Sequence, residues 1–164
     1  TKISDPFADF SIGWNLNLKV YNFDLSVKTY GTFGNDIFRG YERNLNYTNK
    51  PVSVLARWTG EGTSNFEPRA TFVDSNNNVR PSTRYVEDGS YFKIKNVQLG
   101  YNFNVSNSKT LDAVRLYLQG KNLMTFTDYT GYDPEMSYGV LDTSIDRRNY
   151  PSPRTVSVGL NVKF

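Results

Sequence analysis

Residues 156–164 read Val-Ser-Val-Gly-Leu-Asn-Val-Lys-Phe, with an apolar side chain at every second position. Successive side chains of a β-strand point to opposite faces, so this stretch is predicted to be a strand with one apolar and one polar face. Four earlier stretches show the same period of two, at residues 10–20, 23–33, 91–103 and 113–126. The pattern therefore predicts an all-β fold built from about five antiparallel strands.

The third stretch contains an irregularity near Lys95-Asn96. Phe92 and Ile94 lie at even positions, whereas the apolar residues from Val97 onward lie at odd positions. One extra residue in a strand lets the apolar side chains before and after it share a face although their positions differ in parity. We therefore predict a β-bulge at Lys95-Asn96.

Strand length separates two kinds of β-protein. Strands of ordinary proteins have about 5–6 residues, whereas a strand that crosses a bilayer at a tilt needs about 9–11. The five stretches have the longer length. A soluble β-sandwich explains the alternation but not the length, and we keep it as an alternative. The preferred interpretation is a segment of a transmembrane β-barrel.

The connections between the stretches alternate in length. Residues 21–22 and 104–112 are short, whereas 34–90 and 127–153 are long. Membrane barrels have short periplasmic turns and long extracellular loops, so 34–90 and 127–153 are predicted to be extracellular loops, the first partly helical. Residues 154–164 then form the final strand, which runs inward.

Five strands cannot close a membrane barrel, because single-chain bacterial barrels have even numbers of strands from eight upwards. An open sheet edge is also too costly in hydrocarbon. Residues 1–164 are therefore expected to be the C-terminal part of a larger barrel, with the first and last strands paired to strands outside this sequence.

The polar parity of each stretch is predicted to face the barrel lumen. Its side chains suit water, a plug or a hydrated solute. The predicted lumen-facing residues are Asn15, Asn17, Lys19, Asp24, Lys28, Arg115, Tyr117, Gln119 and Lys121.

Aromatic residues are abundant, with 12 Tyr, 11 Phe and 2 Trp. They gather at the ends of the predicted strands, which suggests two girdles at the membrane boundaries. The expected periplasmic girdle comprises Tyr21, Phe23, Tyr101, Phe103 and Phe164, and the outer one comprises Phe7, Phe10, Phe33, Tyr91, Phe92 and Phe126.

Composition excludes several functions. The sequence has no cysteine and no histidine, which excludes disulfides, Cys/His zinc sites and Ser-His-Asp triads. No apolar run is long enough for a transmembrane helix. A net charge of +3 gives no strong attraction to nucleic acid.

Two acidic motifs contain the residue types that calcium sites or glycosidases use. The stretch from Asp74 to Asn78 resembles the start of a calcium loop, but Val79 occupies the position that requires glycine. Asp133 and Glu135 flank Pro134, and a role in locking a loop is favoured over glycosidase chemistry. We therefore expect no enzyme activity, no metal and no cofactor.

Residues 157–164 match the outer-membrane insertion signal, which requires a polar residue, a glycine, an apolar residue and a terminal aromatic at fixed spacing. Ser157, Gly159, Val162 and Phe164 occupy these positions. An exposed aromatic strand end is a feature that insertion machinery can recognise by strand pairing.

Other segments resemble the C-terminal region of the SusC/RagA family of TonB-linked outer-membrane proteins. They are the stretch STRYVEDGSYFKIKNVQLGY at 82–101, QGKNLMTFTDYTGYDPE at 119–135 and NYPSPRTVSVGL at 149–160. Arg57-Trp58-Thr59 and the loop start at 34–38 are similar to elements of the same family. Together these segments cover essentially the whole chain.

This resemblance implies a 22-stranded barrel that holds an N-terminal plug and lies in the outer membrane of a Bacteroidetes bacterium. It also implies a SusD-like surface lipoprotein as a cap, and TonB as the energy source acting through the missing N-terminal part. The implied activity is active import of oligosaccharides or peptides. A passive porin-type barrel and a soluble carbohydrate-binding β-sandwich remain alternatives, and the sequence does not identify the substrate.

The loop at 34–90 carries the candidate contact residues. Tyr41, Trp58 and Phe66 could stack on sugar rings or pack against the lipoprotein, and Arg57 could bind a carboxylate. A purely structural role for Trp58 is the stronger hypothesis.

Local helix is also expected in this loop. Asn35-Asp36 could cap a helix, because Ile37, Phe38, Tyr41 and Leu45 have near-helical spacing. A second helical stretch is expected from Pro51 through Trp58.

Overall fold

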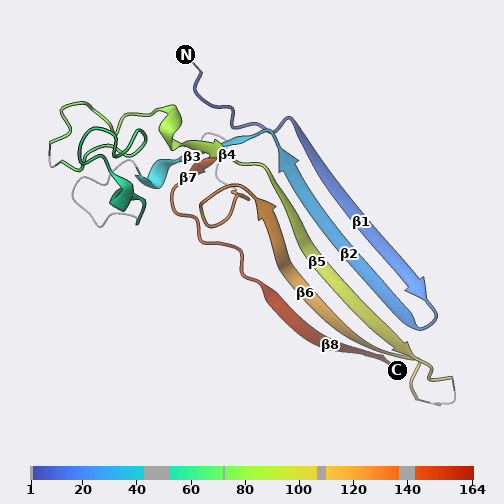
Figure 1. Ribbon diagram of the computed structural model, residues 1–164. Coiled ribbons are helices and arrows are strands. Elements are labelled where there is room, and N and C mark those ends of the chain that lie inside the picture. Colours follow the sequence, from blue (N-terminus) through green and yellow to red (C-terminus); the bar gives the residue numbers. More distant parts are fainter. Residues whose placement is uncertain (1, 43–51, 72, 107–109, 137–142) are drawn as a thin grey trace.

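The computed structural model describes residues 2–42, 52–71, 73–106, 110–136 and 143–164. Five long strands form one antiparallel sheet in the order β1-β2-β5-β6-β8 (Figure 1). The strands are β1 (Phe10–Val20), β2 (Phe23–Phe33), β5 (Tyr91–Phe103), β6 (Ala113–Thr127) and β8 (Thr155–Lys163). The predicted strands are therefore confirmed, including their length.

The connections lie as the alternation of short and long segments predicted. The β1–β2 turn and the β5–β6 connection lie at one end of the sheet, which we call the turn end (Figure 1). Residues 34–90 and 127–153 emerge from the opposite end, which we call the loop end. The β1–β2 turn has two residues, and Tyr21 takes a left-handed conformation with φ 51°, which matches the twist of a tight hairpin.

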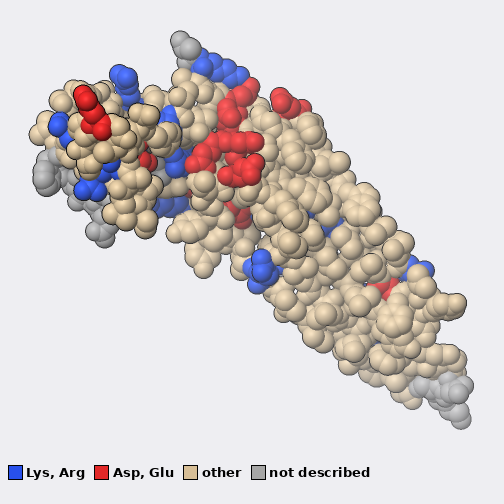
Figure 2. Space-filling view, viewed as in Figure 1, with Lys and Arg blue, Asp and Glu red and all other residues tan. Residues whose placement is uncertain are grey.

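One face of the large sheet is apolar and exposed. No layer of the described chain covers this face, so the soluble β-sandwich alternative is wrong. The exposed residues are Phe10, Ile12, Trp14, Leu18, Val20, Phe23, Leu99, Phe103, Leu116, Leu118, Met124, Phe126, Val156, Val158, Leu160 and Val162. Lipid is the environment that such a surface requires. Figure 2 shows the charged residues gathered over the loops, whereas the visible surface of the large sheet is mostly uncharged.

The predicted β-bulge is confirmed. On one side of β5, Ile94 pairs with Thr29 and Asn96 pairs with Lys28, so Lys95 is the extra residue. On the other side, the pairing with β6 shifts between the same two residues of β5. The bulge keeps Phe92 and Val97 on the apolar face despite their opposite parity.

A small sheet lies at the loop end, in the order β4-β3-β7. It consists of β3 (Asp36–Arg39), β4 (Val86–Asp88) and β7 (Ile145–Asp146), and the β3–β7 pair is parallel. It joins the start and the end of the first long loop to the second long loop. Its core includes Ile37, which is 1% exposed.

The helix expected to start at Asn35-Asp36 is wrong. Residues Asp36–Arg39 form β3 because their backbone pairs with two strands that are distant in the sequence. Only a 3-10 turn follows, η1 (Gly40–Glu42), and Leu45 lies outside the described residues. Within the second expected helix, the structure has the 3-10 turn η2 (Val52–Ala56). A third 3-10 turn, η3 (Thr83–Tyr85), precedes β4.

No helix in the described part of the chain is long and apolar enough to span a membrane.

Candidate functional site

The polar face of the large sheet carries an ion pair near the turn end. Arg115 of β6 reaches across β5 to Asp24 of β2, with 2.9 Å between Arg115 Nε and Asp24 Oδ1. Gly100 of β5 lies between them, and a Cβ atom there would be 2.6 Å from both the guanidinium and the carboxylate. Glycine at this position therefore makes room for the cross-strand contact.

The residues predicted to face the lumen share this polar face. In the register of β1 and β2, Asn15 pairs with Lys28 and Lys19 pairs with Asp24. In β6, Gln119 donates from Nε2 to Asn96 Oδ1 of β5 at 2.7 Å. Asn17, Tyr117 and Lys121 keep the same period of two along their strands. Contact of this face with a lumen stays a prediction.

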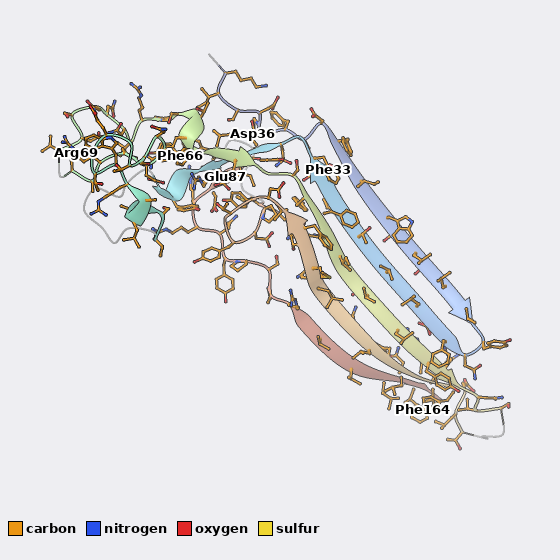
Figure 3. The ribbon with its side chains drawn as sticks, viewed as in Figure 1. Phe33, Asp36, Phe66, Arg69, Glu87 and Phe164 are labelled. Atoms are coloured by element: carbon orange, nitrogen blue, oxygen red, sulfur yellow. The ribbon has the colours of Figure 1, made fainter. Side chains whose placement is uncertain are left out.

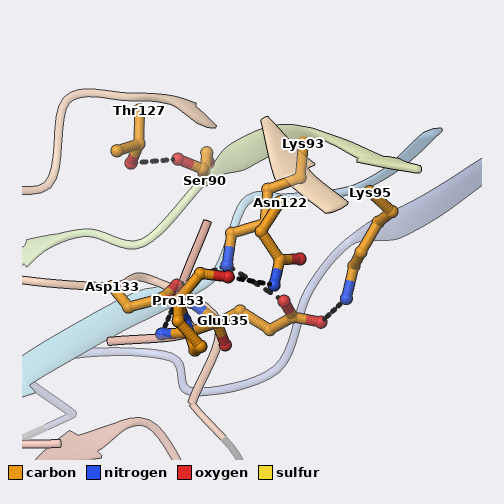
Figure 4. A network of polar contacts seen from close by, with 9 residues as sticks. Ser90, Lys93, Lys95, Asn122, Thr127, Asp133, Glu135 and Pro153 are labelled. Atoms are coloured by element: carbon orange, nitrogen blue, oxygen red, sulfur yellow. Dashed lines mark hydrogen bonds and ion pairs between the residues drawn. The ribbon is translucent and has the colours of Figure 1, made fainter. Parts of the chain in front are cut away.

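A denser charge network lies on the polar face at the loop end (Figure 4). Lys93 Nζ donates to Asp133 Oδ1 at 2.5 Å and to Glu135 Oε2 at 3.0 Å. Lys95 Nζ donates to the other oxygen of Glu135. The Lys93 side chain is only 2% exposed, and we call these four residues the latch.

The latch attaches a short part of the second long loop, residues 129–135, which we call the strap. Two further contacts hold the strap beside the small sheet. The Tyr129 hydroxyl donates to Asp146 Oδ2 at 2.5 Å, and Thr130 N donates to Glu87 Oε2 at 2.9 Å. Figure 3 places Glu87 at the small sheet, far from Phe164 at the turn end.

The carboxylates of the latch are stabilised in their charged form. Burial by itself raises the pKa of Asp133, but hydrogen bonds from Lys93 and from two backbone N–H groups outweigh it and hold this pKa below its ordinary value. The pKa of Glu135 is also lowered, because hydrogen bonds from Lys95 and Lys93 outweigh the effect of burial. Burial and the hydrogen bond to Asp146 raise the pKa of Tyr129, so this tyrosine stays neutral.

The first long loop contains an open cavity of about 480 Å³. Trp58, Phe66, Arg69, Asp74 and Asn76 are among the residues that line it. Figure 3 shows Phe66 and Arg69 within this loop, away from the large sheet.

The structure thus brings two of the four candidate contact residues, Trp58 and Phe66, to the same cavity. Arg57 adjoins Trp58 and donates to Val54 O at 3.4 Å, while Tyr41 lies in η1 and is not among the residues that line this cavity. A binding role for these residues stays a prediction.

Sequence reasoning assigned Asp133 and Glu135 to loop locking but missed their partners, Lys93 and Lys95. Both lysines were visible as cations two positions apart before the parity slip. Their spacing predicts that Lys93 and Lys95 share the polar face, but nothing local in the sequence indicates which residues of a distant loop contact them.

The fold defines the class of protein. Five long antiparallel strands, an exposed apolar face and long loops at one end describe part of the wall of a membrane β-barrel. No family model matches the chain. The comparisons with individual proteins identify the family.

The relatives are TonB-dependent receptors from Formosa agariphila. The receptor named P3 is 36% identical over 99% of this chain, and the receptor named P26 is 35% identical over 99%. The chain spans only 17% and 18% of the lengths of these relatives.

Solved structures of the RagAB peptide importer have the same fold. The "closed-closed" state matches all of this chain and 18% of the solved chain, with a TM-score of 0.79 and 21% identity. The "open-open" state matches 94% of this chain and 17% of the solved chain, with a TM-score of 0.76 and 21% identity.

The chain belongs to the TonB-dependent receptors, of which it is a segment of the barrel wall, and its location is the bacterial outer membrane. The resemblance to SusC/RagA proteins that the sequence motifs indicated is confirmed.

Proposed function

We propose that the whole protein imports a nutrient, an oligosaccharide or a peptide, across the outer membrane with energy delivered by TonB. This segment supplies barrel wall and outer loops. A SusD-like lipoprotein caps the extracellular mouth. The protein performs no enzymatic step, and this segment holds no cofactor.

One observation carries the proposal: nearly the full chain matches receptors named as TonB-dependent, at up to 36% identity. The named function of the RagAB structures, peptide import, supports a solute of peptide size. The aromatic and polar lining of the cavity near Trp58 suits either a sugar or a peptide.

Uptake by living cells tests the proposal. Labelled oligosaccharides and labelled peptides are supplied separately to the source bacterium, to a strain without the full-length gene and to a complemented strain. A fourth strain lacks TonB. We expect uptake of one class of solute to disappear in both deletion strains and to return on complementation.

The passive porin alternative makes a different prediction. A porin needs no energy source, so uptake would depend on the receptor gene but persist without TonB. Uptake that is equal in all four strains would contradict both interpretations. Purification of the full-length protein from native membranes checks the lipoprotein, which should co-elute if it is the cap.

A further inference from the structure

Ion pairs and hydrogen bonds attach both ends of the strap to the two sheets. We propose that residues 129–135 form a fixed constriction at the mouth of the barrel, held on the inner wall by the latch of Lys93, Lys95, Asp133 and Glu135. This inference concerns the conformation of the chain and does not depend on which solute is imported.

Charge balance is the first argument. The latch joins two ammonium groups to two carboxylates, so its net charge is zero. Glu135 bridges both lysines, and Asp133 also accepts from Ser152 N at 3.2 Å. Moving the strap away would leave Lys93 without a partner on the inner wall, and an unpaired charge in such a place is strongly unfavourable.

The spacing of two lysines in β5 is the second argument. Lys93 and Lys95 lie two positions apart, as residues that share one face of a strand do. Both ammonium groups therefore reach the same carboxylate, that of Glu135. Lys95 Nζ lies 5.8 Å from the centre of the Tyr30 ring, a cation–π contact on the polar face.

The strap is also internally compact, which is the third argument. A Cβ atom at Gly131 would be 2.3 Å from the Tyr129 ring, so the ring packs directly on the glycine backbone. Glu135 N donates to Asp133 Oδ1 at 2.9 Å across Pro134. Between these buried anchors, Tyr132 remains 78% exposed. The contacts at both ends leave the strap little freedom to move as a hinged lid.

Distance measurements between two spin labels test this proposal on the full-length protein. One label replaces Tyr132 on the strap and the other replaces Tyr21 at the turn end, where each side chain is exposed. Other cysteines are removed first. The expected result is one narrow distance distribution, with and without the surface lipoprotein.

The decisive variant is Asp133→Asn with Glu135→Gln, which removes both negative charges with little change of shape and leaves the wall strands intact. It should lose the narrow peak and give a broad distribution. The matched control is Lys163→Met with Asp112→Asn, which removes an exposed pair separated by 3.9 Å. The control should keep the narrow peak.

A second variant, Lys93→Met with Lys95→Met, removes the charges from the wall. If it fails to assemble, the loop variant alone decides the question. A narrow peak that persists in a folded latch variant would overturn the proposal. A broad distribution in the unmodified protein would overturn it too, because the strap would then be mobile with its latch intact.

Discussion

Lys93 shows how one residue connects the wall to a loop 40 positions away. Its ammonium is buried, so its stability depends on the two carboxylates that contact it. Breaking such a pair by removing one partner costs about 3–5 kcal/mol in soluble proteins. Glu135 is 28% exposed, so its contact contributes less than that of Asp133, which is 9% exposed.

Acid should release the strap. Both carboxylates have pKa values below their ordinary values of 3.8 and 4.5. A lowered carboxylate pKa stabilises the folded state fully above the ordinary value, and this stability is lost as the pH falls through the lowered value. We expect amide protection of residues 129–135 to be constant from pH 7 to about pH 5 and to fall below about pH 3.5.

Hydrogen exchange of the full-length protein measures this protection. Asp133→Asn with Glu135→Gln serves as the reference, because it should show low protection at every pH. Equal acid sensitivity in the variant would contradict the role of these carboxylates.

Gly159 has a steric role in addition to its place in the insertion signal. A Cβ atom there would lie 2.2 Å from Tyr117 Cζ, since the tyrosine ring packs over the glycine. We expect Gly159→Val to lower the yield of heat-modifiable barrel by displacing this ring, at a cost of about 1–3 kcal/mol.

A double variant separates packing from recognition of the signal. If sterics explain the loss, Tyr117→Ala should restore assembly of Gly159→Val. If the yield stays low in the double variant, the glycine is needed by the insertion machinery itself.

At the scale of elements, the bulge of β5 determines which side chains meet lipid. Deleting Lys95 would remove the extra residue and make the strand regular, so that Phe92 and Ile94 keep the same face as Val97. The contact of Lys95 with Glu135 would be lost. We expect this deletion to retain barrel assembly, measured by heat modifiability in outer-membrane fractions.

The contrasting variant is a deletion of Ser26 in β2, which pairs with β1 without an extra residue. This deletion moves every side chain on one side of it to the other face and should abolish assembly. Failure of the Lys95 deletion, or normal assembly of the Ser26 deletion, would contradict the role of the bulge.

The aromatic residue after β8 belongs to the same scale. Phe164 is 79% exposed and follows the last strand at the turn end. Because an aromatic side chain suits both the membrane boundary and recognition by strand pairing, Phe164→Ala should reduce outer-membrane assembly severalfold. Phe164→Trp should retain it, and equal yields of the two variants would contradict the role of the ring.

At the scale of the whole molecule, the chain has an apolar face without cover and two sheet edges, β1 and β8, each paired on one side only within the described chain. Exposing either the apolar face or the unpaired sheet edges to water is unfavourable and promotes aggregation. Residues 1–164 expressed alone should aggregate or require detergent. A monomeric, cooperatively unfolding product in detergent-free buffer, measured by light scattering and denaturant titration, would contradict the barrel interpretation.

Much of the fold was predictable because the period of two is a local property of the sequence. It located all five strands of the large sheet, their apolar face and the bulge at Lys95. The helix expected near Ile37 does not form, because contacts with distant segments determine the backbone conformation there. Its near-helical spacing was real, but pairing with Val86–Asp88 and Ile145–Asp146 decided the backbone conformation.

Some features of the candidate site were likewise predictable from the sequence, and others were not. Alternation placed Arg115 and Gln119 on the polar face, and Pro134 indicated a locked loop. The partners of that lock were not predictable, because the latch joins positions 40 to 42 residues apart through a folded loop.

The sequence alone determined which residues form long strands and which face each side chain takes, since both follow from neighbours along the chain. Only the tertiary structure decided that Lys93 and Lys95 meet Asp133 and Glu135, that Tyr117 covers Gly159, and that residues 36–39 form a strand. These contacts arise where distant segments meet, and the free energy of pairing there exceeds any local preference.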